Sequence, residues 1–289
     1  MATLRDLKRQ IRSVQNIAKV TEALQTVSAV KFRKAEARVK RARPYAENME
    51  QMMRDVARNA RGESPLLVGR EGNTVAVASI TADRGLAGGF NAQVLRHTWQ
   101  FRREREAEFV QVASGRKAVA FFRFRRIEPK EVYTGFSDNP TYEKAREIGH
   151  ALTKLFEDEE ADEVYLIYNR FESALTQRPV VTRLLPVAPD EEDGEEQEDT
   201  SGTFFEYVED AAEILERLVP RYVETMVWQA LLESAAGEHG ARMTAMKNAT
   251  DNANELAKDL TLEMNKARQA QITREISEIA AGAEALSAG

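Results

Sequence analysis

Residues 242–285 read RMTAMKNATDNANELAKDLTLEMNKARQAQITREISEIAAGAEA, and this stretch decides the fold. It contains no proline, and its only glycine, Gly282, lies near its end. Small or apolar residues recur at alternating steps of three and four, the spacing of a helix that packs along a partner helix. These residues are Met243, Met246, Thr250, Ala253, Ala257, Leu260, Met264 and Ala267. Because many of them are Ala or Thr, we expect the two helix backbones to approach closely.

The predicted partner helix lies at the N-terminus, where apolar residues have the same spacing. They are Leu4, Leu7, Ile11, Val14, Ile17, Val20, Leu24, Val27 and Val30. Each terminal helix would span on the order of 60–80 Å at 1.5 Å per residue. Together they predict a long antiparallel coiled coil. Pro44 is expected to end or kink the first helix and Pro220 to kink the second, with Gly237 and Gly240 as a further soft point.

The middle of the chain has a different pattern, in which short β-branched runs alternate with helical ones. Strands are expected near 74–81, 109–113, 131–136, 163–171 and 177–186, the last two as a hairpin. Helices are expected at 92–108 and 142–156, whereas the signals at 118–124 conflict. The fold class is therefore α/β, with a small α/β domain inserted between the two helices of the coiled coil. The predicted division is 1–60, first stalk helix; 74–187, α/β domain; 188–203, acidic disordered insertion; and 204–289, second stalk helix.

Charge is distributed unevenly along the chain. The net charge is −6, yet residues 1–45 carry twelve Lys or Arg against three Asp or Glu. The segment 190–199, DEEDGEEQED, carries eight carboxylates. No cysteine is present, which excludes disulfides and thiolate metal sites. No apolar run is long enough to span a bilayer, so any membrane association is expected to come through a partner.

Catalytic motifs are missing from the sequence. The turn Gly85-Leu-Ala-Gly-Gly-Phe-Asn91 follows a strand and precedes a helix, which is a place for phosphate, but no Gly-Lys-Ser/Thr closes it. We therefore favour a tight structural turn. His97, His150 and His239 lack metal-ligand spacing, and no GxSxG motif occurs. The expectation is a chain that is not an enzyme on its own and uses no metal or cofactor.

Three segments, in order, make the chain resemble the gamma subunit of F-type ATP synthase. They are IRSVQNIAKVTEALQTVSAVKFRKA from Ile11, ITADRGLAGGFN from Ile80 and ITREISEIAAGAEA from Ile272. The last is similar to the family signature at Ile272, Thr273, Glu275, Glu278, Gly282 and Ala283. The segment 190–202 departs from the family, and no role is carried over to it.

The resemblance implies a central shaft that turns inside a hexagon of three alpha and three beta subunits. Its α/β domain would bind the epsilon subunit and the c-ring at the cytoplasmic face of a bacterial plasma membrane. By similarity, Arg268 and Gln269 would bind a beta-subunit loop, and Ile272, Ile276 and Ile279 would turn in a hydrophobic collar. Basic residues of the first helix would face an acidic lever segment of beta; they are Lys19, Lys31, Arg33 and Lys34.

Two other classes of function remain open from the residues alone. A coiled-coil nucleic-acid-binding or scaffolding protein would place the basic first helix on phosphate, and salt-sensitive DNA binding would reveal it. An enzyme that binds nucleotide at Gly85–Gly89 would bind ATP as an isolated chain.

Overall fold

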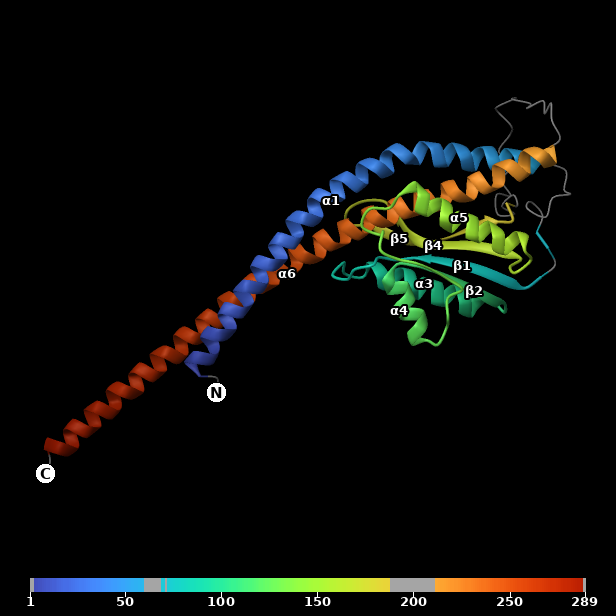
Figure 1. The fold of residues 1–289 in the computed structure, drawn as a ribbon. Helices are drawn as coiled ribbons and strands as arrows, with labels where there is room; N and C mark the ends of the chain where they lie inside the picture. Colours follow the sequence, from blue (N-terminus) through green and yellow to red (C-terminus); the bar gives the residue numbers. More distant parts are fainter. Residues whose placement is uncertain (1–2, 60–68, 71, 188–210, 288–289) are drawn as a thin grey trace, which may run out of the picture. The chain divides into compact units, whose positions relative to one another are not determined.

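The computed structural model describes residues 3–59, 69–70, 72–187 and 211–287 (Figure 1). Two compact units divide it: residues 1–28 with 243–289, and residues 29–242. The predicted acidic insertion and the predicted start of the return helix at 204 lie outside the described residues, and the predicted domain division stays a prediction. The helices are α1 (Leu4–Asn59), α3 (Phe90–Glu104), α4 (Arg116–Phe124), α5 (Tyr142–Glu157) and α6 (Ala211–Ser287).

The unit that joins the two ends of the chain is an antiparallel pair of helices with a seam of small residues. All eight positions predicted on α6, from Met243 to Ala267, are buried or half-buried. The Thr21 and Thr250 hydroxyls lie 2.6 Å apart across the seam. At the start of α1, Thr3 and Asp6 cap each other, since Asp6 N donates to Thr3 Oγ1 at 3.2 Å and Thr3 Oγ1 donates to Asp6 Oδ2 at 2.8 Å.

Beyond Val14, the predicted seam on α1 is wrong at every position except Leu24. Ile17, Val20, Val27 and Val30 are 52%, 60%, 54% and 66% exposed. The buried positions are instead Ala18 and Ser28, with Thr21 and Leu24 half-buried. Small side chains take the inner face because it must match the Ala- and Thr-rich seam of α6, and the Ser28 hydroxyl is satisfied by donating to Leu24 O at 2.7 Å. The larger β-branched residues of α1 consequently form a second, exposed stripe.

The other unit is built on a five-stranded sheet of order β3-β2-β1-β4-β5. Its strands are β1 (Thr74–Ile80), β2 (Glu108–Ser114), β3 (Glu131–Tyr133), β4 (Glu163–Phe171) and β5 (Gln177–Leu185). β1 pairs in parallel with β2 and β4, β3 pairs in parallel with β2, and β5 is antiparallel to β4, as the predicted hairpin required. The ambiguous segment 118–124 is helical, within α4.

Helices cover both faces of the sheet (Figure 1). One face carries α3 and α4, with Val94 packed against Val75, Val77 and Ile167. The opposite face carries α5 together with residues of α1 and α6, and this is the larger core. It contains Met53 of α1, Leu152 of α5 and Val223 of α6, which are all at most 1% exposed.

Neither proline ends its helix, so of the two outcomes predicted for Pro44, an end or a kink, the structure excludes the end. The helix α1 runs through Pro44 to Asn59, and α6 runs through Pro220. A proline inside a helix costs about 3 kcal/mol, because it removes a hydrogen bond and crowds the preceding turn. Apolar packing offsets this cost on the far side of each proline, through Met49 and Met53 in α1 and through Val223 and Val227 in α6.

The loop between β3 and α5 is held by one carboxylate. Asp83 accepts backbone N–H groups from Arg116 at 3.1 Å, Gly135 at 2.8 Å and Ser137 at 3.1 Å. Burial alone would raise the pKa of Asp83, but these hydrogen bonds hold it below its ordinary value. The turn after β1 therefore fixes the turn before α5, which carries part of the site described next.

Candidate functional site

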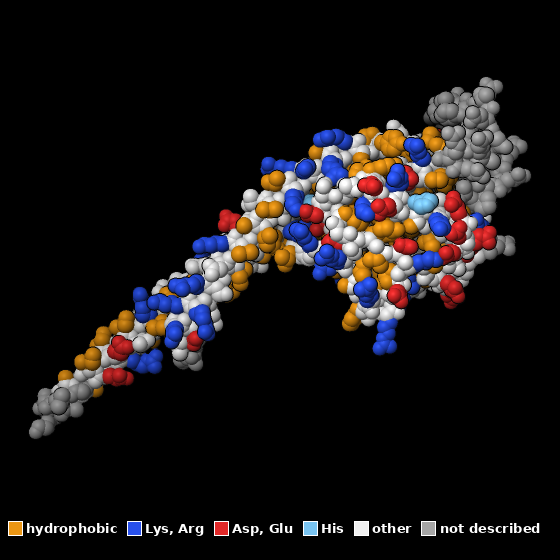
Figure 2. Space-filling model, in the orientation of Figure 1, with side chains coloured by type: hydrophobic (Ala, Val, Ile, Leu, Met, Phe, Trp, Pro, Cys, Tyr) orange, Lys and Arg blue, Asp and Glu red, His pale blue; other side chains and the backbone are white. Residues whose placement is uncertain are grey.

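The end of α6 is a helix without a partner among the described residues. From Arg268 to Ala281 every residue is exposed, whereas the seam is buried or half-buried up to Ala267. Ile272, Ile276 and Ile279 are 47%, 61% and 73% exposed, and their spacing of four and three places them on one helix face. Figure 2 shows hydrophobic side chains toward this end, beyond a stretch rich in Lys and Arg. An apolar stripe of this kind is typical of a surface that binds another protein.

The predicted basic residues of α1 fall into different surroundings. Lys19 is exposed in the coiled-coil unit, and Arg33 is exposed in the sheet-containing unit. Lys31 is half-buried and forms an ion pair with Asp138 of the β3–α5 loop. Lys34 is exposed and lines the same pocket as Lys31. Of the four, the structure thus brings only Lys31 and Lys34 together.

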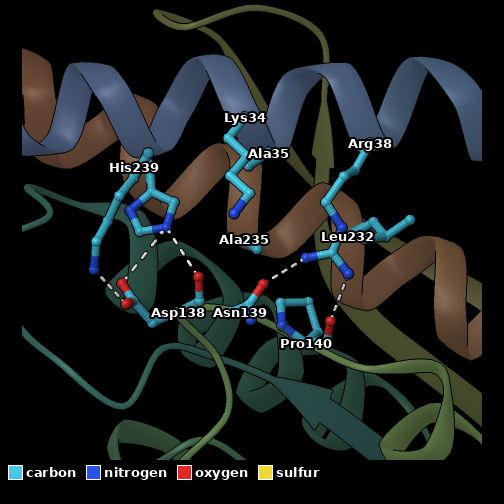
Figure 3. Close-up of a pocket in the computed structure, with 10 residues that line it drawn as sticks. Lys34, Ala35, Arg38, Asp138, Asn139, Pro140, Leu232, Ala235 and His239 are labelled. Atoms are coloured by element: carbon cyan, nitrogen blue, oxygen red, sulfur yellow. Dashed lines mark hydrogen bonds and ion pairs between the residues drawn. The ribbon is translucent and has the colours of Figure 1, made fainter.

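That pocket is a cavity of about 130 Å³ between α1, α6 and the β3–α5 loop (Figure 3). Arg38 spans one end, donating to Asn139 Oδ1 at 2.7 Å and to the Pro140 carbonyl at 2.6 Å. His239 of α6 closes the other end. Figure 3 shows Lys34 extending from α1 into the space between His239 and Arg38. Arg38, Asp138 and His239 could not be identified as neighbours from the sequence, because nothing in their spacing links residues about one hundred positions apart.

The imidazole of His239 is only 2% exposed. Its Nε2 lies 3.2 Å from the Asp138 carbonyl oxygen and 3.5 Å from Asp138 Oδ1. Because both neighbours are acceptors, Nε2 carries the proton of the neutral ring. Nδ1 is buried and has no hydrogen-bond partner among the residues that the structure describes. Burial lowers the pKa of His239 below its ordinary value of 6.5, despite the nearby carboxylates, so the ring is neutral at pH 7.

His239 should make the folded chain less stable in mild acid. The unfolded ring takes up a proton near pH 6.5, whereas the folded ring resists it. The free energy of unfolding should therefore fall as pH decreases through about 6.5 toward the lower folded pKa. Urea titrations between pH 5.5 and 8 measure this slope, and His239→Gln, which retains a donor toward Asp138, should flatten it. An unchanged slope in the variant would contradict the assignment.

The glycine turn after β1 packs against helix α6 of the same chain. In open parallel sheets, ligands bind at the carboxyl ends of the strands where the strand order reverses, which here is beside β1. Arg242 of α6 donates to the Gly85 carbonyl at 3.1 Å and pairs with buried Glu238 at 2.6 Å. A Cβ at Gly237 would lie 2.9 Å from the Phe90 ring, so α6 packs directly on the turn.

Both glycines of α6 are positions of close approach, Gly237 to the Phe90 ring and Gly240 to the Ala174 backbone in the β4–β5 turn, and α6 is helical through both. The Lys117 ammonium, from the first turn of α4, lies 3.6 Å from where a Gly85 Cβ would be, so a lysine lies beside the glycine turn. The sequence does not indicate that Lys117 lies beside the turn, because this residue is not part of the glycine motif. With α6 seated on the turn, a structural role is still the interpretation that fits best.

A buried carboxylate joins α1, α6 and the end of β4. Glu233 is 4% exposed; it accepts from Phe171 N at 3.0 Å, Gln229 Nε2 at 2.7 Å and Arg43 at 3.2 Å. Arg43 also donates to the Phe171 carbonyl at 3.0 Å. These contacts link the three elements at one point. In the sequence, the only indication of this buried link is a glutamate among the apolar residues of α6, and the sequence does not identify its partners.

Neither a membrane-spanning helix nor a metal site is found in the part of the chain that the structure describes. No described helix is long and apolar enough to cross a membrane. In the same parts of the chain, no group of three or more His, Cys, Asp or Glu is arranged to hold a metal ion.

Comparison with known proteins gives consistent matches along the whole chain. A family model described as ATP synthase matches residues 3–286. The ATP synthase gamma chain of Rubrobacter xylanophilus is 70% identical over 292 residues, covering 100% of both chains. That of Pelotomaculum thermopropionicum is 46% identical over 289 residues, covering 99% of this chain and 100% of the relative.

Solved structures are similar in fold. A chain of the Euglena gracilis mitochondrial ATP synthase, OSCP/F1/c-ring, matches with a TM-score of 0.70 and 16% identity, covering 99% of this chain and 95% of that one. A chain of the Tetrahymena thermophila central stalk/c-ring matches with a TM-score of 0.60 and 23% identity, covering 80% and 99%. At these identities the structural likeness concerns the fold alone.

Proposed function

This chain belongs to the ATP synthase gamma chain family, and we propose that it is the central-stalk rotor of a proton-translocating F-type ATP synthase. It is a non-catalytic subunit of the membrane-associated F1 complex. In this role it transmits rotation of the c-ring to the beta subunits, stands inside an alpha3beta3 hexamer and binds the epsilon subunit. The bacterial relatives support a location at the cytoplasmic face of the plasma membrane.

The observation that carries this proposal is the unpaired, apolar end of α6. Ile272, Ile276 and Ile279 are exposed on one face of a single helix, which is unfavourable in water unless a partner covers them. A hydrophobic collar in the hexamer would cover such a stripe without fixing its rotational position. Arg268 and Gln269 are exposed just before this stripe, and in the proposed complex they would hydrogen-bond a beta-subunit loop at the entrance of the collar.

The basic residues of α1 are proposed to face acidic segments of the beta subunits. Lys19 and Arg33 are exposed and available for such contacts. Lys31 and Lys34 would contribute from the rim of the pocket, with Lys31 shared with Asp138. Exposed ion pairs are worth roughly 0–1 kcal/mol each, which suits contacts that must form and break in each turn.

The experiment that tests the proposed function is reconstitution with alpha and beta subunits. A probe fixed to the sheet-containing unit should rotate in one direction when ATP is added to the immobilised complex. Assembly and ATP hydrolysis without rotation of this chain would contradict a rotor role.

The apolar end of α6 can be tested separately in the same complex. Ile276→Asp places a charge in the proposed collar, so proton-driven ATP synthesis should fall several-fold. Leu256→Asp makes the same kind of change at a position of α6 that is 49% exposed but outside the tip, and it should be tolerated better. Equal loss in both variants would show that the tip has no special role.

The isolated chain is expected to bind ATP no more tightly than the millimolar range. The glycine turn lacks a P-loop lysine, and α6 packs on it through Gly237 and Arg242. Calorimetric titration of the purified chain measures the affinity. Micromolar binding that Lys117→Ala abolished would show that the turn is a nucleotide site after all.

A further inference from the structure

We infer that the pocket lined by Lys31, Lys34, Arg38, Asp138 and His239 is a binding site for a tetrahedral phosphate-class oxyanion, either free phosphate or the terminal phosphate of a nucleotide. This goes beyond the proposed rotor function, which requires no small ligand on this subunit.

Positive charge predominates around the cavity. Three cations, Lys31, Lys34 and Arg38, reach it from α1, and one carboxylate, Asp138, faces them from the β3–α5 loop. His239 of α6, the other titratable residue of the lining, is neutral at pH 7 because its pKa is lowered. Arg84 is also close enough to lower the pKa of Asp138, so it adds positive charge nearby. The cavity therefore carries an excess of two positive charges from its own lining.

The protein's own acceptors around the cavity leave part of this positive charge uncompensated. Asp138 is paired with Lys31 and lies beside His239. Within the described part of the chain, the acceptors of Arg38 are both neutral: the Asn139 side chain and the Pro140 carbonyl. Lys34 has no hydrogen bond or ion pair with any part of the chain that the structure describes. Like charges three and four residues apart on a helix repel each other, and an anion between Lys34 and Arg38 would reverse that repulsion.

The shape of the cavity also suits a small tetrahedral anion. Lys34 extends into the cavity from above, and Arg38 and His239 stand at its two ends (Figure 3). A volume of about 130 Å³ has room for one small anion. A tetrahedral ion offers acceptors in several directions at once, and ammonium and guanidinium groups are the usual partners of phosphate. A bound ion would link α1 to the β3–α5 loop, where Arg38 already makes its two hydrogen bonds.

Phosphate titration of the purified full-length chain, followed by isothermal calorimetry at constant ionic strength, tests this inference. We expect saturable binding in the millimolar range, with sulfate binding similarly and chloride producing no saturable signal. Lys34→Ala should weaken phosphate binding about tenfold, through loss of one charge-assisted hydrogen bond, and Lys34→Arg should retain it. Arg33→Ala is the matched control, since it removes the same charge one residue away at an exposed position outside the pocket.

The outcomes are distinct. Weakening by Lys34→Ala but not by Arg33→Ala supports the site. Equal weakening by both variants would indicate general attraction to the basic helix and overturn the inference, as would absence of saturable binding or an equal response to chloride. If ATP displaces bound phosphate at lower concentrations than added phosphate does, the ligand is the terminal phosphate of a nucleotide. If ATP does not displace bound phosphate, the ligand is free phosphate. Circular dichroism of each variant checks that it is folded, which the exposure of Lys34 leads us to expect.

Discussion

Replacing Glu233 by Ala is expected to destabilise the chain by about 2–3 kcal/mol. The substitution removes the carboxylate that accepts three hydrogen bonds. Two of these, from Phe171 N and from Gln229 Nε2, are buried. Each donor left unsatisfied in the interior costs about 1–3 kcal/mol. Arg43 is 40% exposed and can turn to water, so its loss adds little. Urea unfolding of the purified chain measures the change in free energy.

The matched control for this substitution is Glu224→Ala on the same helix. Glu224 accepts one hydrogen bond from the Tyr142 hydroxyl at 3.0 Å in an exposed contact. Its removal should cost less than about 1 kcal/mol, because water replaces the lost partner. If the two variants unfolded at the same urea concentration, the Glu233 contacts would not be a principal link between α1, α6 and β4.

The second large effect is expected at Ala253 in the seam. Ala253 is 8% exposed, one turn beyond Thr250, whose hydroxyl meets that of Thr21. In an antiparallel pair this places Ala253 near the level of buried Ala18. Replacing Ala253 by Leu adds volume where the helices are closest, and overpacking of this kind costs about 1–3 kcal/mol. The helix pair should then separate or shift its register.

In the assembled complex, this change should reduce proton-driven ATP synthesis more than ATP hydrolysis. Synthesis requires the shaft to transmit torque, whereas hydrolysis proceeds with a loosely held shaft. Lys258→Leu provides the comparison, because Lys258 is exposed on α6 and the added leucine meets no partner helix. A loss of coupling in Lys258→Leu with none in Ala253→Leu would mean that the helix face assigned to the seam is wrong.

The fold could largely be predicted from the sequence because its periodicities are strong. The steps of three and four on α6 identified its inner face down to Ala267, and the β-branched runs located the strands to within a few residues. α4 was ambiguous because the aromatic residues in AVAFFRF suit a strand as well as a helix. Its start is decided by Gly115, whose φ of +90° and close approach to the Thr81 carbonyl turn the chain out of β2.

Large apolar side chains do not mark the inner face of α1 between Ile17 and Val30, although they predict it. Val20 and Val27 are more hydrophobic than Ala18, Thr21 and Ser28, yet the small residues face α6. The Thr21 and Ser28 hydroxyls are satisfied by carbonyls of the preceding turn, so burying them costs little. Applying the small-residue pattern of α6 to its partner would have given the observed face.

The candidate site was the part that the sequence could not supply. Lys31 and Lys34 were identified as basic surface, but their surroundings depend on Asp138 and His239, which arrive from distant segments. Asp138 itself is positioned through Asp83, which holds the loop that carries it. Contacts of this kind follow from tertiary packing rather than from any local pattern.

The composition of the main core has a consequence for the synthesis of this protein in the cell. That core needs Met53 from α1, Leu166 from β4 and Val223 from α6, so its parts leave the ribosome far apart in time. At about 5–20 residues per second, the sheet waits several seconds for the last helix that covers it. During that interval the nascent chain exposes the part of the sheet face that α6 will cover, and exposed apolar surface is what chaperones recognise. A fragment limited to residues 74–187 retains α5 but lacks α1 and α6, so part of that face would stay uncovered, and we expect the fragment to aggregate when expressed alone.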